Sequence, residues 1–194
     1  MNRLHRHFCR SGFWRKQLEE RLLPWVLGDA SLGSDLLEVG PGPGLATDWL
    51  RQRAERLTSI EIDEPLAASL EDRLEGTNVE VVRGDATDMP FADDRFSAAV
   101  SFTMLHHVPS PELQDRLLRE VHRVLRPGGF FAGSDSISSR TFEWMHVFDT
   151  LVPVEPKTFG ARLEASGFTD VSVTAASRTF RFRARKAARR TFRS

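Results

Sequence analysis

Cysteine is nearly absent from the sequence, since Cys9 is the only one among 194 residues. A single thiol cannot form an intramolecular disulfide, and it cannot supply the cysteine cluster of a structural metal site. We therefore expect neither a disulfide framework nor a bound metal. Such cysteine usage is typical of the reducing cytoplasm, where we expect the protein to be located.

Long apolar runs are also missing. The sequence has no stretch of about 18 consecutive apolar residues. Its first residues, MNRLHRHFCRSGFWRK, lack the apolar centre of a secretory signal. The sequence thus predicts no transmembrane segment. With 40% hydrophobic and 28% charged residues over 194 positions, the chain is long enough for one well-buried α/β domain and short for two.

A net charge is absent too, because 27 basic side chains balance 27 acidic ones. The basic residues are nevertheless concentrated at the two ends: five lie in residues 1–16 and eight in residues 178–194, and neither segment contains an acid. Basic ends bind nucleic acid or anionic membranes in some proteins, but most such charge runs are solvated faces or tails. Nucleic acid is therefore not the partner that we expect.

The apolar pattern alternates between strand and helix periods. Short apolar runs predict strands at residues 36–39, 57–62, 79–84, 96–102, 130–135, 168–174 and 177–185. Helical spacing predicts helices at about 45–53, 66–74, 111–126 and 156–166, the last two ended by Pro127-Gly128-Gly129 and by Gly167. The alternation favours a mostly parallel sheet, and the short turn before the last strand favours an antiparallel hairpin.

An amphipathic helix is also predicted ahead of the first strand. Four apolar residues there fall at helical spacing, namely Leu18, Leu22, Trp25 and Val26. Pro24 weakens this helix or kinks it. We expect the helix to pack on the main domain. The chain is thus expected to have three parts: a helical segment at residues 1–34, a main domain at residues 35–185 and a basic tail at residues 186–194.

A glycine-rich loop connects the first strand to the first helix of the main domain. Gly40, Gly42 and Gly44 alternate with prolines there, and without Cβ atoms the backbone can approach a ligand closely. A tight turn alone needs one or two glycines. The spacing differs from the dinucleotide pattern G-x-G-x-x-G, because Leu45 occupies the third glycine position. No phosphate-binding lysine follows, which excludes a P-loop.

Acidic residues follow the next two strands. Glu61 ends the second strand about twenty residues beyond the loop, where open α/β sheets place a carboxylate that accepts hydrogen bonds from ribose hydroxyls. Asp63 is an alternative ligand for the same hydroxyls. The third strand ends in Gly84-Asp85-Ala86, which puts an acid and a backbone amide beside the position of an adenine. Ligands of such folds bind outside the carboxyl ends of the strands.

In this order, the segments resemble the class I, Rossmann-like S-adenosylmethionine-dependent methyltransferases, specifically the small-molecule group. That group is characterised by E-x-G-x-G-x-G, an acid, G-D-A and then L-x-P-G-G. The similar stretches run from Leu36 to Asp135 and read LLEVGPGPG, SIEID, VRGDATDMPF, FSAAVSFTMLHHV and LLREVHRVLRPGGFF. One departure is Ser97, where the family commonly has an acid after the phenylalanine that opens the fourth strand.

The resemblance implies a fold, a cofactor and a reaction. The fold would be a doubly wound, mostly parallel seven-stranded sheet with an antiparallel C-terminal hairpin and helices on both faces. Residues 35–185 would bind S-adenosylmethionine. An acceptor O, N, S or C would attack the sulfonium methyl group in line and leave S-adenosylhomocysteine, in a site that orients both reactants. We expect a small-molecule acceptor.

The resemblance also assigns roles in cofactor binding. The three glycines would border the methionine part, and Glu38 would hold that part through water or its amino group. Glu61 would bind the ribose and Ile62 would lie on one face of the adenine. Asp85 would accept a hydrogen bond from the adenine amino group, and the Ala86 amide would donate one to a ring nitrogen.

The end of the fourth strand would line the methionine end of the cofactor and the entry of the acceptor, through Ser101, Phe102 and Thr103. Three nearby residues are candidate general bases, namely His106, His107 and Asp135. Histidines at these positions also serve as local structure in relatives. Asp135 is equally suited to cap the turn that follows its strand.

Several other apolar patterns have two interpretations. One set of side chains could form a lid over the acceptor or ordinary core: Phe142, Trp144, Met145, Phe148 and Leu151. Another could close over the site or anchor the first helix: Phe8, Phe13 and Trp14. In the last strand arginines alternate with Phe180 and Phe182, which predicts an edge strand with arginines on its solvent-facing side.

Three other functions compete with a small-molecule methyltransferase. A dinucleotide oxidoreductase would share the loop and Glu61, but the glycine spacing and Gly84-Asp85-Ala86 argue against it. A non-catalytic interaction module could keep the cofactor fold. A nucleic-acid methyltransferase of the amino-methylating kind needs an Asn/Asp-Pro-Pro-aromatic loop, whereas this chain has Ser101-Phe102-Thr103-Met104.

Overall fold

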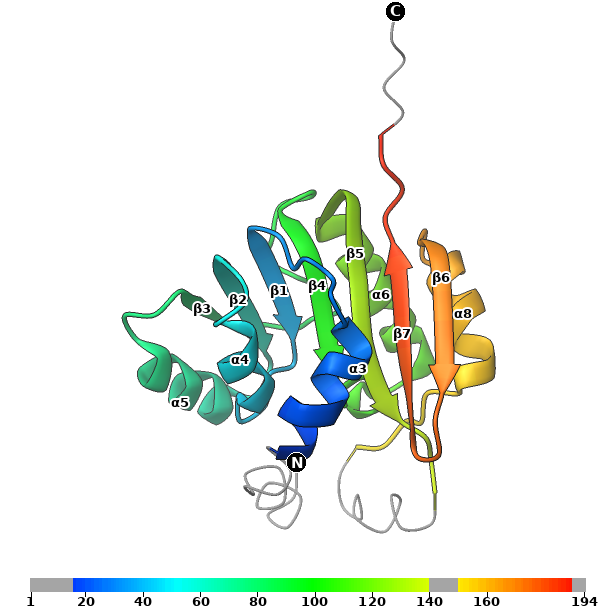
Figure 1. The fold of residues 1–194 in the computed structure, drawn as a ribbon, viewed down its shortest axis with the longest axis horizontal. Helices are drawn as coiled ribbons and strands as arrows, with labels where there is room; N and C mark the ends of the chain where they lie inside the picture. The colour runs from blue at the N-terminus through cyan, green and yellow to red at the C-terminus, as the bar shows by residue number, and fades with distance from the viewer. Residues whose placement is uncertain (1–15, 140–149, 190–194) are drawn as a thin grey trace, which may run out of the picture.

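The computed structural model describes residues 16–139 and 150–189, which form one seven-stranded sheet with helices packed on it (Figure 1). The strand order is β3-β2-β1-β4-β5-β7-β6. The strands are β1 (Asp35–Val39), β2 (Arg56–Glu61), β3 (Val79–Arg83), β4 (Phe96–Phe102), β5 (Leu125–Ser136), β6 (Thr169–Ala175) and β7 (Thr179–Arg185). β1 to β5 pair in parallel, and β7 is antiparallel to both β5 and β6. The predicted Rossmann-like fold is confirmed.

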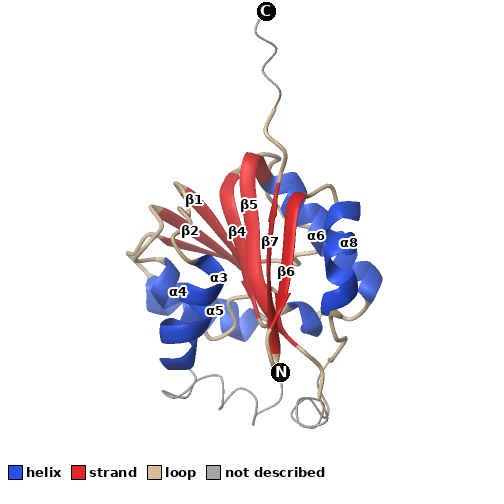
Figure 2. Ribbon diagram, turned by 45° about the vertical axis from the view of Figure 1, so that its right-hand side comes forward, coloured by secondary structure: helices blue, strands red, loops and turns tan. Residues whose placement is uncertain are grey.

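Helices cover both faces of the sheet (Figure 2). One face carries α3 (Leu23–Leu27), α4 (Leu45–Leu50) and α5 (Glu64–Leu74), and the other carries α6 (Pro111–Val124) and α8 (Pro156–Ala165). The alternation of side chains along each strand supplies both faces. In β1, Leu36 packs with the α3 and α4 side chains, whereas Leu37 and Val39 pack with those of α6 and α8.

The junction between α6 and β5 differs from the prediction. The helix ends at Val124, and β5 begins at the next residue, so Pro127-Gly128-Gly129 lie inside the strand and do not end the helix. The register between β4 and β5 shifts here, between Phe96 and Ala98. Gly128 has a φ of 84°, which a bulge can accommodate without a Cβ atom. Pairing with β4 and β7 therefore decides where β5 begins.

The predicted N-terminal helix is present with a wide turn in its centre. A π-helix, η1 (Leu18–Leu22), leads directly into α3, which has Pro24 in its first turn. Pro24 has no N–H to donate to the preceding turn, and the wider π-helical turn lies directly before it. Leu18 and Val26 are buried against the sheet. The helix therefore continues past Pro24, and its apolar side chains join the core on this face.

The arginines of the last strand contradict the prediction of a solvent-facing edge. β7 lies between β5 and β6, and its phenylalanines pack with α8. Its arginines lie on the α3 side of the sheet, where Arg181 donates to the Trp25 carbonyl oxygen and Arg183 Nε donates to the Val26 carbonyl oxygen at 2.7 Å. These carbonyls end α3 and have no partner within the helix. The arginines thus cap a helix.

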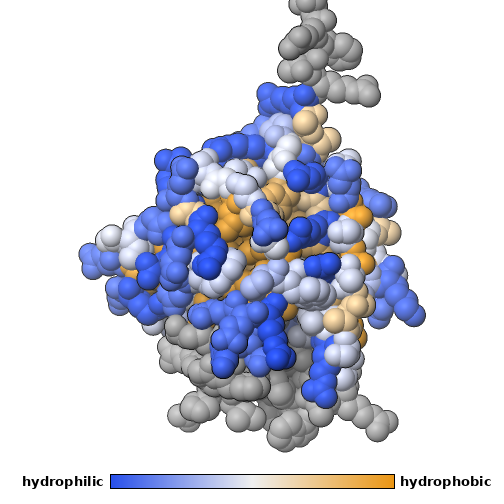
Figure 3. Space-filling view, in the orientation of Figure 1, coloured by the Kyte–Doolittle hydropathy of each residue, from blue (hydrophilic) through white to orange (hydrophobic). Residues whose placement is uncertain are grey.

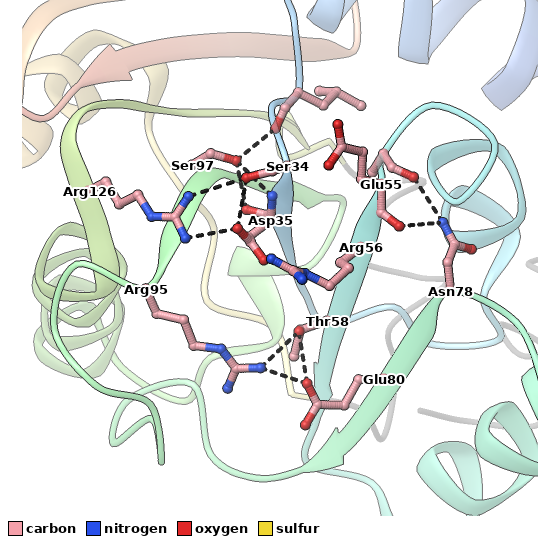
Figure 4. A network of polar contacts seen from close by, with 12 residues as sticks. Ser34, Asp35, Glu55, Arg56, Thr58, Asn78, Glu80, Arg95, Ser97 and Arg126 are labelled. Carbon is pink, nitrogen blue, oxygen red and sulfur yellow. Dashed lines mark hydrogen bonds and ion pairs between the residues drawn. The ribbon is translucent and has the colours of Figure 1, made fainter.

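Charged and hydroxyl groups join the amino ends of several strands (Figure 4). The Asp35 carboxylate accepts hydrogen bonds from Arg56 at 2.7 Å and from Arg126 at 2.8 Å. The Arg56 contact is the main cause that holds the pKa of Asp35 far below its usual range, and the Ser34 hydroxyl and Arg126 add to it. Ser97, at the departure from the family pattern, accepts from the Asp35 amide at 3.0 Å. Ser97 is therefore a structural residue.

The surface is mostly polar on the face shown in Figure 3, where apolar side chains are visible only in separate patches. Within residues 16–139 and 150–189, no helix combines the length and the apolar composition that a bilayer crossing requires. In the same ranges, no three His, Cys, Asp or Glu side chains are grouped as metal ligands would be.

Candidate active site

The carboxyl ends of β1, β2 and β4 meet at one edge of the sheet, which is the lower edge in Figure 1. A cavity of about 390 Å³ lies there. Parallel sheets bind their ligands at this edge. Among the predicted site residues, the cavity is lined by Gly40, Gly42, Glu61, Ile62, Asp63, Asp85, Ala86, Phe102, Thr103 and His107. The fold therefore gathers most of the predicted cofactor residues, which lie far apart in the sequence, around one cavity.

The glycine loop needs its glycines because of its backbone geometry. Gly40, Gly42 and Gly44 have φ values of 69°, 54° and 82°, which side-chain-bearing residues adopt rarely. The loop closes through a hydrogen bond from the Gly44 amide to the Pro41 carbonyl oxygen, at 2.9 Å. The Gly42 amide points to the neighbouring strand and donates to Glu61 Oε2 at 3.0 Å.

Glu61 is the carboxylate that joins this loop to β2. Its side chain is buried, and Oε1 accepts a hydrogen bond from the Asp63 amide at 3.0 Å. The two amides fix the carboxylate in place and leave acceptor capacity on both oxygens for a ligand. Asp63, the alternative ribose ligand, also lines the cavity, but it caps α5, where its Oδ1 accepts from the Leu66 amide at 3.1 Å. The geometry thus favours Glu61.

The adenine side of the predicted site presents an apolar side chain and an acid. Ile62 is 66% exposed and is the only large apolar residue exposed to this degree in the described parts of the chain. Because Ile62 also lines the cavity, its exposed side chain is accessible to a ligand there. Asp85 Oδ1 accepts from the Thr87 amide at 2.8 Å, which orients the carboxylate beside Ala86 and leaves its other oxygen available.

Glu38 lies beneath the glycine loop and does not line the cavity itself. Its Oε2 accepts hydrogen bonds from the hydroxyl groups of Thr47, at 2.7 Å, and Ser59, at 2.8 Å. Burial raises the pKa of Glu38 to about 7, and the negative charge of Glu61 adds to this effect against the two hydroxyl donors. A buried acid with this pKa is costly to ionise and is typical of functional sites.

Glu38 should make the stability of the protein depend on pH. Its pKa rises from 4.5 to about 7 on folding, so the folded protein loses stability as the pH increases through this range. We expect Glu38→Gln to be more stable than the wild type by about 3 kcal/mol at pH 8, and the difference to vanish below about pH 4. Urea unfolding at both pH values measures it. Equal stability of the variant and the wild type at pH 8 would contradict a raised pKa of Glu38.

The three candidate bases occupy different environments. Asp135 is fully buried, and its carboxylate accepts from His106 Nδ1 at 2.5 Å and from the His106 amide at 3.0 Å. Neither of the two lines the cavity. His107, the next residue of the 3-10 turn η2 (Leu105–His107), does line it. The structure thus separates a buried His106–Asp135 pair, behind the turn, from a histidine at the cavity wall.

The end of β4 contributes differently from what was predicted. Ser101 is buried, does not line the cavity and has no hydrogen-bond partner for its hydroxyl among the described residues. Phe102 and Thr103 do line the cavity. Thr103 has a φ of 51°, held by a hydrogen bond from its amide to the Ser134 carbonyl oxygen at 2.8 Å. A β-branched residue in this conformation is strained, and such strain is common in binding sites.

Sequence reasoning missed one of the residues that hold η2. Gln114, buried on α6, donates to the Leu105 carbonyl oxygen at 3.1 Å and to the Val152 carbonyl oxygen at 2.9 Å. The Val152 amide in turn donates to the His106 carbonyl oxygen at 2.8 Å. The only sign of this role in the sequence was a glutamine among the apolar residues of the predicted helix at 111–126. Gln114 therefore holds the turn that presents His107 to the cavity.

The two aromatic-rich segments fall almost entirely outside the described residues. These are Phe142, Trp144, Met145 and Phe148 of the predicted lid, and Phe8, Phe13 and Trp14 near the N-terminus. Leu151 is described and is partly buried, but it does not line the cavity. That the two aromatic-rich segments help to close the site remains a prediction.

Comparisons with known proteins agree with this geometry. Residues 37–133 match the family described as "Methyltransferase domain". The chain is 35% identical over 106 residues to a fatty-acid O-methyltransferase of Mycolicibacterium smegmatis, covering 54% of this chain and 38% of that protein. It is 32% identical over 147 residues to a ribosomal RNA small subunit methyltransferase A of Leptothrix cholodnii, covering 68% and 54%. The chain thus spans about half or less of the length of these curated relatives.

Solved structures share the fold. Phosphoethanolamine N-methyltransferase 2 of Haemonchus contortus, in complex with S-adenosyl-L-methionine, superposes with a TM-score of 0.75 at 13% identity, over 96% of this chain and 60% of that one. The family match over residues 37–133 and the order of the seven strands together assign the chain to a family. The chain belongs to the class I S-adenosylmethionine-dependent methyltransferases.

Proposed function

We propose that this methyltransferase binds S-adenosylmethionine in the cavity at the carboxyl ends of β1, β2 and β4, and transfers its methyl group to a small molecule. One observation carries the proposal: the glycine loop, a fixed carboxylate and an exposed apolar side chain border the same cavity, through Gly42, Glu61 and Ile62. The loop also fits a ligand sterically, because a Cβ atom at Gly42 would meet no atom within 4 Å.

Each part of the cofactor has a complementary group in this arrangement. Glu61 would accept hydrogen bonds from the ribose hydroxyls, and Ile62 would cover one adenine face. Asp85 and the Ala86 amide would pair with the adenine edge. Glu38 does not line the cavity, so it would act on the methionine part through water. When bound, S-adenosylmethionine supplies a methyl group that is already activated for displacement.

His107 is the best-placed candidate for a general base. Its Nδ1 lies 3.3 Å from the Thr150 carbonyl oxygen, which can only accept a hydrogen bond. Nδ1 therefore carries the proton, and Nε2 is the basic nitrogen of the neutral ring. We assign His106 and Asp135 a positioning role, because they fix η2 without reaching the cavity.

The acceptor is proposed to be small because three basic residues near the C-terminus are engaged within the protein. Arg181 and Arg183 cap α3, and Lys186 lies 2.7 Å from a carboxylate oxygen of Asp94, whereas Arg189, which pairs with the same carboxylate, is 80% exposed. Phosphate recognition requires basic groups that face the solvent. A relative named for ribosomal RNA makes RNA the main alternative acceptor.

The acceptor class is tested by following S-adenosylhomocysteine formation with hydroxyl-, amine- and carboxyl-bearing small molecules, and separately with purified ribosomal RNA. Turnover with a small molecule and no methylation of RNA supports the proposal. RNA methylation, with binding that weakens steeply as salt increases, would replace it with a nucleic-acid function.

With an acceptor in hand, His107→Gln should lower kcat by at least about tenfold, because a positioned base is lost. Its S-adenosylhomocysteine affinity should stay within about twofold of the wild type. His122→Gln on α6 is the matched control, since His122 packs on Phe168, away from the cavity. Equal kcat values for the two variants would exclude His107 as the base.

A further inference from the structure

The three glycines of the loop have different neighbours. A Cβ atom at Gly40 would lie 2.2 Å from Met104 Cγ, and one at Gly44 would lie 2.4 Å from Arg73 Nη2. At Gly42 the same position is open. Only Gly42 therefore leaves space for a ligand, whereas the other two glycines allow side chains of the protein to approach the loop backbone.

Two side chains approach Gly44 equally closely, because Leu70 Cδ1 would also lie 2.4 Å from a Cβ atom there. The second is the Arg73 guanidinium group, which contacts two segments, the loop and α4. Arg73, on α5, donates through Nη2 to the carbonyl oxygens of Pro43 and Gly44, at 3.4 and 3.3 Å. Through Nη1 it donates to Asp48 Oδ1 on α4, at 2.6 Å. The planar fork of arginine suits such divided contacts. One side chain thus joins the loop to the two helices that flank it.

We propose that Arg73 is a positioning residue for cofactor binding, which holds the backbone of residues 42–44 against α4 and α5. This inference rests on the proposed function. Arg73 does not line the cavity, so its effect must pass through the loop. The loop conformation that it holds is the one in which the Gly42 amide bonds to Glu61 and leaves its open side to the cavity.

The exposure of Arg73 separates this role from a general contribution to stability. The Arg73 side chain is 41% exposed, and ion pairs at such positions contribute little to folding. A change in cofactor affinity without a matching loss of stability is therefore the signature of the positioning role. Arg95 is the matched control, because it is 37% exposed and donates to Glu80 Oε2 at 2.6 Å. It lies just before β4, at the amino ends of the strands and therefore away from the cavity.

The test compares Arg73→Gln, Arg73→Lys and Arg95→Gln by calorimetric titration with S-adenosylhomocysteine and by thermal unfolding. We expect Arg73→Gln to raise Kd by about tenfold and to lower Tm by no more than about 3 °C. Arg73→Lys keeps the charge beside Asp48 without the planar fork, so its Kd should stay at least about threefold above the wild type. Arg95→Gln should bind as the wild type does.

Hydrogen exchange in the free protein provides a second readout. The Gly44 amide, which bonds to the Pro41 carbonyl oxygen, should exchange at least about fivefold faster in Arg73→Gln. An unchanged Kd together with unchanged exchange would overturn the proposal, and so would full recovery by lysine. A wild type that does not bind S-adenosylhomocysteine would instead refute the proposed function, while the exchange rates would still decide whether Arg73 holds the loop.

Discussion

Glu61→Ala is expected to weaken S-adenosylhomocysteine binding by at least about 100-fold. The substitution removes the proposed ribose acceptor. It also leaves the amides of Gly42 and Asp63 without the carboxylate that now binds both. The loss therefore combines a direct contact with the order of the loop, which is why we expect it to exceed the effect of any other single cofactor residue. Calorimetric titration of the variant measures it.

The control for this prediction is Glu64→Ala, three residues along the chain. Glu64 is 65% exposed and pairs with Arg83 at 3.1 Å on the surface of α5. Its removal should change affinity by less than about twofold. If Glu61→Ala bound S-adenosylhomocysteine as tightly as Glu64→Ala, the ribose contact would have to be assigned elsewhere.

Asp135→Ala is expected to lower the free energy of unfolding by about 3 kcal/mol or more. The carboxylate is fully buried and accepts hydrogen bonds from both the ring and the amide of His106, and from the Ser136 amide at 2.6 Å. Alanine removes the acceptor of all three donors and leaves the two donors of His106 buried without it. Urea unfolding at pH 7 measures the change.

Asp135→Asn separates the charge from the hydrogen bonds, because an amide oxygen can still accept from the His106 amide. We expect Asn to recover part of the loss, on the order of 1 kcal/mol. Because η2 also carries His107, the alanine variant that remains folded should lose methyl transfer as well. A change in stability below about 1 kcal/mol on Asp135→Ala would show that the buried pair does not hold the turn.

Much of the fold followed from local patterns. The run FSAAVSF predicted β4 with its actual bounds, because an apolar run between polar residues is buried on both faces of a parallel sheet. The start of β5 was predicted wrongly, since Pro127-Gly128-Gly129 is a local stop signal and pairing with β4 extends the strand through it. In β7 the alternation identified which side chains share a face, but only the packed structure shows that α3 covers the arginines.

The candidate site was predictable where backbone geometry constrains the residue type. Glycines with positive φ and an acid at a strand end have few alternatives, and the fold brings Gly42 within hydrogen-bond distance of Glu61. Gln114 and Arg73 were not predictable, because their roles come from carbonyl oxygens that the fold brings to them. Which of the two histidines, His106 or His107, lines the cavity likewise depends on Asp135, which bonds to His106 and lies 29 residues further along the chain.

The most direct test of this account is calorimetric titration of the wild-type protein with S-adenosylmethionine and S-adenosylhomocysteine, with NAD as the control ligand. The account predicts that both sulfur-containing nucleosides bind, that each raises Tm, and that NAD does neither. No heat and no thermal stabilisation with either nucleoside would contradict the assignment of the cavity as the cofactor site.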